Sequence, residues 1–255
     1  MKKFCLLNVI ACIFAGIVFI SCDKSDDDPG VSSITSITAQ VVKGSDYDLD
    51  NVKAVMYYGN DEKYMVAEGR YEIDKFTIIL PSEVNGKYLE NIGDDMPDGI
   101  KISDASASIG AISIEGYKSG DYVDDFYYAK IEIGITEKSL SLIGGGFIYV
   151  DKDVTITGSY SEKTDDGMTL NVSFNVFLKK GWNIMYALLS MSDKNPAITI
   201  KAVTKDPGGL KWYFAGGDLE LIDLLPFQPK SLIESATNEQ DIFPKYKIMG
   251  IKWCN

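Results

Sequence analysis

The stretch "TLNVSFNVFL", residues 169–178, alternates apolar and polar side chains along almost its whole length. Asn171, Ser173 and Asn175 hold one set of alternate positions. The other set is apolar throughout and consists of Leu170, Val172, Phe174, Val176 and Leu178. Successive side chains of a β-strand point to opposite faces, so this pattern predicts a strand with one face in a core and the other toward solvent. Strands of this kind are typical of antiparallel sheets.

The same alternation recurs on both sides of this stretch. In "DVTITGSY", residues 153–160, one face carries Val154, Ile156 and Tyr160 and the other carries Thr155, Thr157 and Ser159. Similar runs occupy residues 34–42, 52–58, 63–70, 75–81, 110–117, 126–135, 182–189 and 197–203. Asp166-Gly167 stands between two alternating segments, as a tight hairpin turn requires. No sustained helical pattern precedes Phe214. We therefore predict an all-β fold of antiparallel β-sandwich type, as one large domain or two small packed ones.

A change of composition at "NIGDDMPDGIKISDASAS", residues 91–108, is the best internal boundary. It divides the chain into an N-terminal β block at 34–92 and a C-terminal β block at 103–215. Four strands alone leave an open sheet, so we expect the blocks to pack as sandwich layers or as adjoining small domains. Residues 216–255 form a tail whose pattern is compatible with one or two short helices and a last strand.

The N-terminal residues have the features of an export signal. Lys2 and Lys3 give a positive start, residues 4–20 are almost wholly apolar, and Ser21 places a small residue ahead of Cys22. This pattern predicts a signal peptide at 1–21 with a cleavage site. The apolar run is short for a membrane span and no cationic cluster follows it, so a permanent transmembrane helix is the weaker alternative. An ordinary signal peptide with an incidental cysteine is the other.

The residues around the cysteine resemble known lipoprotein signals. "FISC", residues 19–22, resembles the lipobox of bacterial lipoproteins, which implies that the Cys22 thiol carries lipid and anchors the chain to a membrane. "CDKSDDD", residues 22–28, resembles the lysine-plus-acid export signal of Bacteroidetes surface lipoproteins, here formed by Lys24, Asp26, Asp27 and Asp28. The resemblance implies an outer-membrane location facing the cell exterior. A solvated acidic tether over residues 22–33 is the alternative interpretation.

Charge and cysteine content agree with an exported domain. The formal net charge of −12 argues against a nucleic-acid partner and against electrostatic docking on anionic lipid. Of the four cysteines, Cys5 and Cys12 leave with the signal peptide and Cys22 is modified, which leaves Cys254 as the one thiol. No internal disulfide is therefore expected.

The chain lacks the residues of common catalytic sites. It has no histidine, which excludes Ser-His-Asp and Cys-His nucleophilic systems and most zinc or haem sites. "GYKSG", residues 116–120, is not a nucleophile elbow because Ser119 stands one position late, and no phosphate-binding glycine loop is present. We predict a protein that is not an enzyme and has no cofactor. A glycosidase that uses two carboxylates is the remaining catalytic alternative.

Two acidic segments raise the question of calcium. "DYDLDN" offers Asp46, Asp48 and Asp50 at alternating positions, but Asn51 stands where an EF-hand loop has glycine and Tyr57 where it has glutamate. "GDDMPDG", residues 93–99, also has three aspartates, yet aspartate and glycine around proline are ordinary turn residues. No metal site is predicted.

Aromatic residues give the one candidate ligand site. In "DDFYYAKIEIGI", residues 124–135, the inward set includes Tyr127, Ala129 and Ile131, which leaves Phe126 and Tyr128 on the face that carries Lys130. Exposed aromatic rings stack on sugars or anchor protein partners. Phe126 and Tyr128 are thus the predicted ligand-binding residues. The alternative is that another part of the chain covers them.

The mature part also resembles a family. "GGFIYVDKDVTITGSY" (145–160) followed by "FLKKGWNIMYALL" (177–189), with "KFTIILPSEVNGKYLENI" (75–92) upstream, is similar to a recurrent pattern in uncharacterised surface lipoproteins of gut Bacteroidetes. The likeness covers about residues 34–214 and implies a β-rich extracytoplasmic lipoprotein without an assigned activity. The leading hypothesis is a non-catalytic cell-surface lipoprotein that binds a glycan or a protein. The alternative is a structural or adhesive subunit that resembles fimbrillin-type lipoproteins.

Overall fold

The computed structural model describes residues 34–58, 62–93, 96–134, 139–163, 168–192 and 195–215. Several predictions fall elsewhere in the chain. The signal peptide, the tether with Cys22, Lys24, Asp26, Asp27 and Asp28, the turn at Asp166-Gly167 and the tail at 216–255 all lie outside the described residues. Asp94 and Asp95 lie outside them as well.

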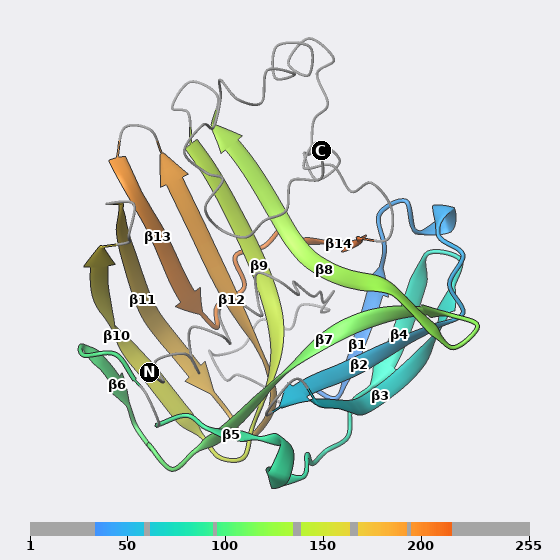
Figure 1. Ribbon diagram of the computed structural model, residues 1–255, viewed down its shortest axis with the longest axis horizontal. Helices are drawn as coiled ribbons and strands as arrows, with labels where there is room; N and C mark the ends of the chain where they lie inside the picture. The colour runs from blue at the N-terminus through green and yellow to red at the C-terminus, as the bar shows by residue number, and fades with distance from the viewer. Residues whose placement is uncertain are drawn as a thin grey trace.

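The predicted all-β class is confirmed, since the described residues hold strands, two short 3-10 turns and no α-helix (Figure 1). Within these residues, no helix is long and apolar enough to cross a membrane. The elements are β1 (Ser36–Gln40), η1 (Gly44–Asp46), β2 (Asn51–Tyr58), β3 (Glu62–Glu72), β4 (Lys75–Ile79), η2 (Gly86–Tyr88), β5 (Glu90–Asn91), β6 (Ile100–Ile102), β7 (Ser108–Lys118), β8 (Asp121–Gly134), β9 (Ser139–Val150), β10 (Val154–Lys163), β11 (Thr169–Leu178), β12 (Gly181–Ser192), β13 (Asn195–Val203) and β14 (Lys211–Phe214).

These strands form one curved, mostly antiparallel sheet of 14 strands. Its main order is β1-β4-β3-β2-β7-β8-β9-β12-β13-β11-β10-β6, while β14 pairs with β8 and β5 with β7. β11 pairs antiparallel with β10 but parallel with β13. The alternation in β11 therefore predicted the strand and its buried face, and not the direction of both neighbours.

The first half of the sheet closes on itself. β14 pairs with β8 along Lys211–Phe214, and on its other side the Val42 N–H donates to the Trp212 carbonyl oxygen at 2.8 Å. Val41 and Trp212 also form a parallel bridge. Together β1, β4, β3, β2, β7, β8 and β14 make a ring of strands, called here the strand ring, on the right of Figure 1. Its interior is an aromatic-rich core that contains Phe76, Phe126, Trp212 and Phe214.

The second half is the open part of the sheet, from β9 to β6, on the left of Figure 1. One of its faces forms a separate aliphatic core that contains Val154, Ile156, Val172, Phe174 and Val176. These are the residues whose alternation predicted the strands, and each is less than 5% exposed. The opposite face carries the hydroxyl and amide side chains of the same strands.

The two sequence blocks are joined within one hydrogen-bonded sheet. β2 of the N-terminal block pairs with β7 of the C-terminal block over six residues, from Asn51↔Tyr117 to Met56↔Ile112. The short strand β6 lies between the two blocks, and β5 lies at the end of the N-terminal block. The strand ring thus takes its strands from both blocks, and it places the outer faces of β2, β3, β7 and β8 side by side.

Candidate functional site

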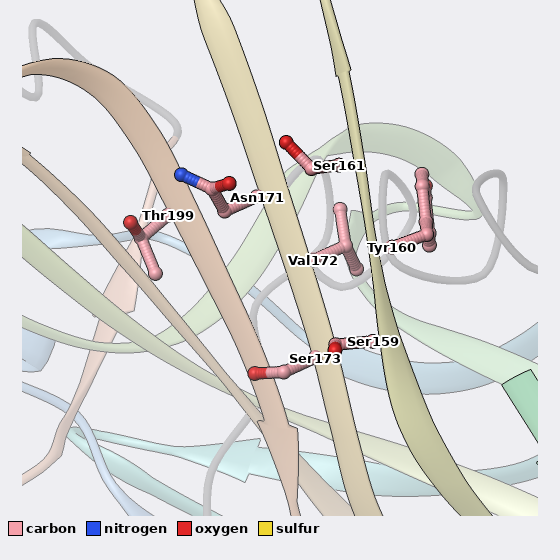
Figure 2. A pocket seen from close by; sticks show the side chains of 7 residues that line it. All are labelled: Ser159, Tyr160, Ser161, Asn171, Val172, Ser173 and Thr199. Carbon is pink, nitrogen blue, oxygen red and sulfur yellow. The ribbon is translucent and has the colours of Figure 1, made fainter. Parts of the chain in front are cut away.

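A shallow pocket of about 290 Å³ lies on the polar face of the open sheet (Figure 2). It is lined from three neighbouring strands, with Ser159, Tyr160 and Ser161 from β10, Asn171, Val172 and Ser173 from β11, and Thr199 from β13. The pocket formed by its serine, threonine and asparagine side chains, Ser159, Ser161, Asn171, Ser173 and Thr199, is called here the hydroxyl pocket. All seven lining residues are uncharged.

Phe126 and Tyr128 do not lie on a free surface, so the exposure predicted for them is wrong. Phe126 is fully buried and Tyr128 is 4% exposed. The prediction that Phe126 and Tyr128 share one face of β8 was right, and Phe126 lies opposite Ile114 of β7 in the strand pair. That face is the interior of the strand ring, where the Phe126 ring meets the rings of Phe76 and Phe214. The covering strands β1, β4 and β14 come from distant parts of the sequence.

Exposed aromatic rings occur instead on the outside of the strand ring. Tyr57 on β2 and Tyr122 on β8 are 43% and 47% exposed. Tyr117 on β7 is half-buried, and its ring lies 6.1 Å from that of Tyr122 in an edge-to-face arrangement. These three residues, Tyr57, Tyr117 and Tyr122, are called here the tyrosine platform. Met65 on β3 and Val123 on β8 are also exposed.

Strand register brings the side chains of this surface together. β2 buries Val52, Ala54 and Met56 in the ring interior, so Lys53 and Tyr57 point outward. On β7, Glu115 points outward opposite Lys53 on one side and Asp125 on the other. A two-residue turn at Ser119-Gly120 connects β7 to β8, and both residues have positive φ, 52° and 92°. Glycine suits the second position because that conformation costs it little.

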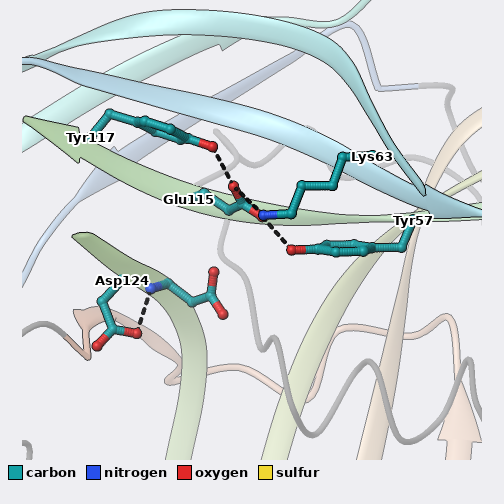
Figure 3. A network of polar contacts seen from close by, with 6 residues as sticks. Tyr57, Lys63, Glu115, Tyr117 and Asp124 are labelled. Carbon is teal, nitrogen blue, oxygen red and sulfur yellow. Dashed lines mark hydrogen bonds and ion pairs between the residues drawn. The ribbon is translucent and has the colours of Figure 1, made fainter. Parts of the chain in front are cut away.

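Glu115 is the centre of the site, and Figure 3 shows its contacts. It is fully buried, yet it lies on the outer face of β7. The Tyr57 hydroxyl donates to its Oε1 at 2.6 Å, and the Tyr117 hydroxyl donates to its Oε2 at 2.6 Å. Lys63 Nζ, from β3, contacts both oxygens at 3.1 and 3.4 Å. A buried carboxylate is tolerated when charge-assisted hydrogen bonds and an opposite charge satisfy it, as they do here.

These bonds hold the tyrosine rings in place. Two hydroxyls are tied to one carboxylate, so the Tyr57 and Tyr117 rings have little freedom to rotate away. Lysines cover part of the ring faces: Lys53 Nζ lies 3.8 Å from the centroid of the Tyr117 ring, and Lys63 Nζ lies 5.0 and 5.1 Å from those of Tyr57 and Tyr122. Such cation–π contacts add to the rigidity of the surface.

Two further carboxylates lie beside this network. Asp125 is the cross-strand partner of Glu115, and its backbone N–H donates to the Asp124 carboxylate at 2.8 Å. Burial, followed by the negative charges of Glu115 and Asp124, raises the pKa of Asp125 to about 6. Like charges directly opposite each other in a strand pair are destabilising. The surroundings of Asp125 therefore bring its pKa close to neutral pH.

The same surroundings shift the pKa values of the hydroxyl and ammonium groups. Burial and the hydrogen bond to Glu115 raise the pKa of Tyr57, and they raise that of Tyr117 to about 12. Burial disfavours the charged form of Lys63, but hydrogen bonds with Tyr57 and Glu115 outweigh it and raise the pKa of Lys63. At neutral pH the tyrosines are therefore neutral donors and Lys63 is an ammonium ion.

The carboxylates around the platform are engaged by protein groups. The Tyr57 and Tyr117 hydroxyls and Lys63 Nζ all contact the Glu115 carboxylate, so both of its oxygens are engaged by protein donors. The acidic segment at 46–50 is also engaged, because Lys118 Nζ contacts Asp48 at 2.6 Å and Asp50 at 2.9 Å. Among the described residues, no group of three or more Asp, Glu, Cys or His side chains is placed to hold a metal ion.

Comparisons with known proteins add no assignment. Neither a protein-family model, nor a curated protein, nor a solved structure matched this chain.

Sequence reasoning missed the tyrosine platform, although one signal for it was present. "GAISIEGY", residues 110–117, places Glu115 in the outward set of an apolar strand together with Ser113 and Tyr117. A charged residue in such a strand indicates either a solvated face or a paired buried charge. The partners Tyr57 and Lys63 come from other strands, so only the register of β2, β3 and β7 decides between the two.

Proposed function

We propose that this chain is a non-catalytic cell-surface lipoprotein, anchored through lipid on Cys22, that binds a glycan or protein ligand on the tyrosine platform. One observation carries the proposal: Tyr57 and Tyr122 expose nearly half of their surface while the Glu115 network fixes the platform beneath. Aromatic rings that are rigid before binding lose little conformational entropy on contact, which favours affinity. The lipobox and the export signal support the surface location.

The shape of the platform fits the ligand classes named above. Tyrosine supplies an apolar face and a polar rim, which suits the apolar faces of sugars and the anchor residues of protein interfaces. Lys53 and Lys63 lie among the rings together with Asp124 and Asp125, so the surface also offers charges of both signs. The absence of histidine and the occupied Glu115 carboxylate both support a binding role over a catalytic one.

Removing the two exposed rings should weaken the ligand. In a Tyr57→Ala/Tyr122→Ala variant, the loss of about 0.5–1.5 kcal/mol per ring, beyond area burial, predicts a dissociation constant about tenfold to hundredfold higher. Isothermal titration calorimetry with a ligand retained in a glycan-array and pull-down screen measures this change. Ile79→Ala, an exposed apolar residue on β4, is the matched control and should leave affinity unchanged. Equal affinities of the double variant and the control would refute the platform as the site.

The lipid anchor has a separate test. Cells that express the chain should incorporate a clickable palmitate analogue into it, and Cys22→Ser should abolish the label because no acceptor thiol remains at the mature N-terminus. Cys254→Ser is the control and should keep full labelling. Undiminished incorporation into Cys22→Ser would show that the lipobox interpretation is wrong.

A further inference from the structure

The hydroxyl pocket on the open sheet has a regular arrangement. Strand pairing aligns Ser161, Asn171 and Thr199 in one row across β10, β11 and β13. It aligns Ser159 and Ser173 in the next row, beside Lys201. Neighbouring strands lie about 4.8 Å apart and alternate residues about 6.7 Å apart along a strand, so the polar groups form a small grid. Figure 2 shows the five polar side chains on the strands that carry them.

The polar groups of this grid are available to a ligand. Throughout the described ranges, the hydroxyl and amide groups of Ser159, Ser161, Asn171, Ser173 and Thr199 make no hydrogen bond to another protein group. Some other hydroxyls of the sheet are satisfied internally: the Thr38 and Thr77 hydroxyls lie 3.2 Å apart on β1 and β4. The Thr204 hydroxyl accepts from the Phe177 N–H at 3.4 Å. The polar groups of the pocket therefore differ from these three threonine hydroxyls, which have protein partners.

The grid is also rigid. β11 is paired on both sides, with β10 and with β13. The residues that alternate with the polar ones are held in the aliphatic core, where Val172 is 1% exposed and Ile198 and Ile200 are 5% and 8% exposed. Donors and acceptors on such strands keep their positions before a ligand arrives, which lowers the entropic cost of binding.

The chemistry of the lining selects the class of ligand. A hydroxyl both donates and accepts, and the Asn171 amide offers two donors and an acceptor, so the pocket matches a molecule with many hydroxyls. No charged side chain is among the lining residues, and the one neighbouring charge in these two rows is Lys201, beside Ser173 at the edge. Tyr160 and Val172 belong to the opposite face by strand alternation, so apolar area is small.

We propose that the hydroxyl pocket is a binding site for uncharged carbohydrate, formed by Ser159, Ser161, Asn171, Ser173 and Thr199. The hydroxyl pocket and the tyrosine platform lie on different strands and offer different contacts. An experiment can therefore refute one site without refuting the other. The pocket gives the protein a contact for a neutral sugar unit through hydrogen bonds, where the platform offers stacking.

The test uses the full chain in detergent and a panel of neutral gluco-, galacto- and manno-oligosaccharides of four to six units, titrated into the millimolar range. We expect saturable binding of at least one of them. An Asn171→Ala/Ser173→Ala/Thr199→Val variant should raise its dissociation constant at least tenfold, because three hydrogen-bonding groups are lost while the backbone is unchanged. Thr77→Val on β4 is the matched control and should bind as the unchanged protein does. Tyr57→Ala/Tyr122→Ala is titrated beside it to show whether the platform holds the same sugar.

The melting temperature of each variant shows that it is folded. If the triple variant unfolds, the single Thr199→Val change, which keeps the side-chain shape, takes its place and should weaken binding severalfold. The proposal is overturned if no oligosaccharide of the panel binds saturably, or if a folded pocket variant binds as well as the Thr77→Val control. Loss of binding in the tyrosine variant together with normal binding in the pocket variant would assign the sugar to the platform and also overturn it.

Discussion

Replacing Phe126 with alanine should lower the free energy of unfolding by about 3–5 kcal/mol, because a large side chain is removed from a closed core. Phe126 is fully buried, and its ring centroid lies 4.7 Å from that of Phe214 and 5.0 Å from that of Phe76. These neighbours come from β14 and β4, so the cavity would open where the strand ring closes. Chemical denaturation of the variant and of the unchanged protein measures the difference.

Phe177→Ala is the control for this change. Phe177 is also a phenylalanine on a strand, but it is 48% exposed. Surface substitutions change stability by about 0.5 kcal/mol or somewhat more for an aromatic residue on a strand. Similar losses for the two variants would contradict the closed ring, because Phe126 would then be no better packed than a surface residue.

Stability should also fall as the pH rises from about 4 to about 7, through the ionisation of Asp125. Its folded pKa of about 6 lies above the ordinary value of 3.8, so the folded state holds this proton more tightly than the unfolded state. The contribution is full below the unfolded pKa and is lost as the pH rises through the folded pKa. This pKa shift corresponds to about 2 kcal/mol of unfolding free energy after allowance for partial solvent exposure.

The groups that face Asp125 explain the size of this effect. Glu115 and Asp124 oppose its ionisation, while Lys63 and the Tyr122 hydroxyl favour it. Asp125→Asn should remove this part of the pH dependence and stabilise the protein at pH 7.5, as measured by denaturation at a series of pH values. Asp50→Asn is the control, because hydrogen bonds from Ser119 and Lys118 lower the pKa of Asp50 and move its titration out of this range. An unchanged slope between pH 5 and 7 in Asp125→Asn would contradict the assignment.

Alternation along the sequence was enough to predict the strands of the open sheet. Val172, Phe174 and Val176 are buried and Asn175 is exposed, as the pattern in 169–178 requires. This works in β11 because one face lies against the aliphatic core and the other carries polar side chains that are at least partly exposed. In β8 the pattern also divided the residues correctly between two faces, but it assigned the Phe126 face to solvent. That face is buried because β14 and β1, which come from opposite ends of the described chain, close the strand ring.

The candidate sites depend on register, which a single sequence does not determine. Glu115 and Tyr117 are close in sequence, whereas Tyr57 and Lys63 reach the carboxylate only because β2 and β3 pair in one particular alignment. The hydroxyl pocket is similar, since Thr199 meets Asn171 through a parallel pair that the pattern did not reveal. Local pattern therefore predicted the elements, and long-range pairing created the surfaces.

The most direct test of the binding proposal is one parallel screen. The unchanged protein and the Tyr57→Ala/Tyr122→Ala variant are applied side by side to the same glycan array and the same pull-down of surface proteins. We predict a ligand that the unchanged protein retains and the variant loses, with a cooperative melting transition showing that the variant is folded at the assay temperature. Retention of the same ligands by both proteins would contradict the tyrosine platform as the binding site.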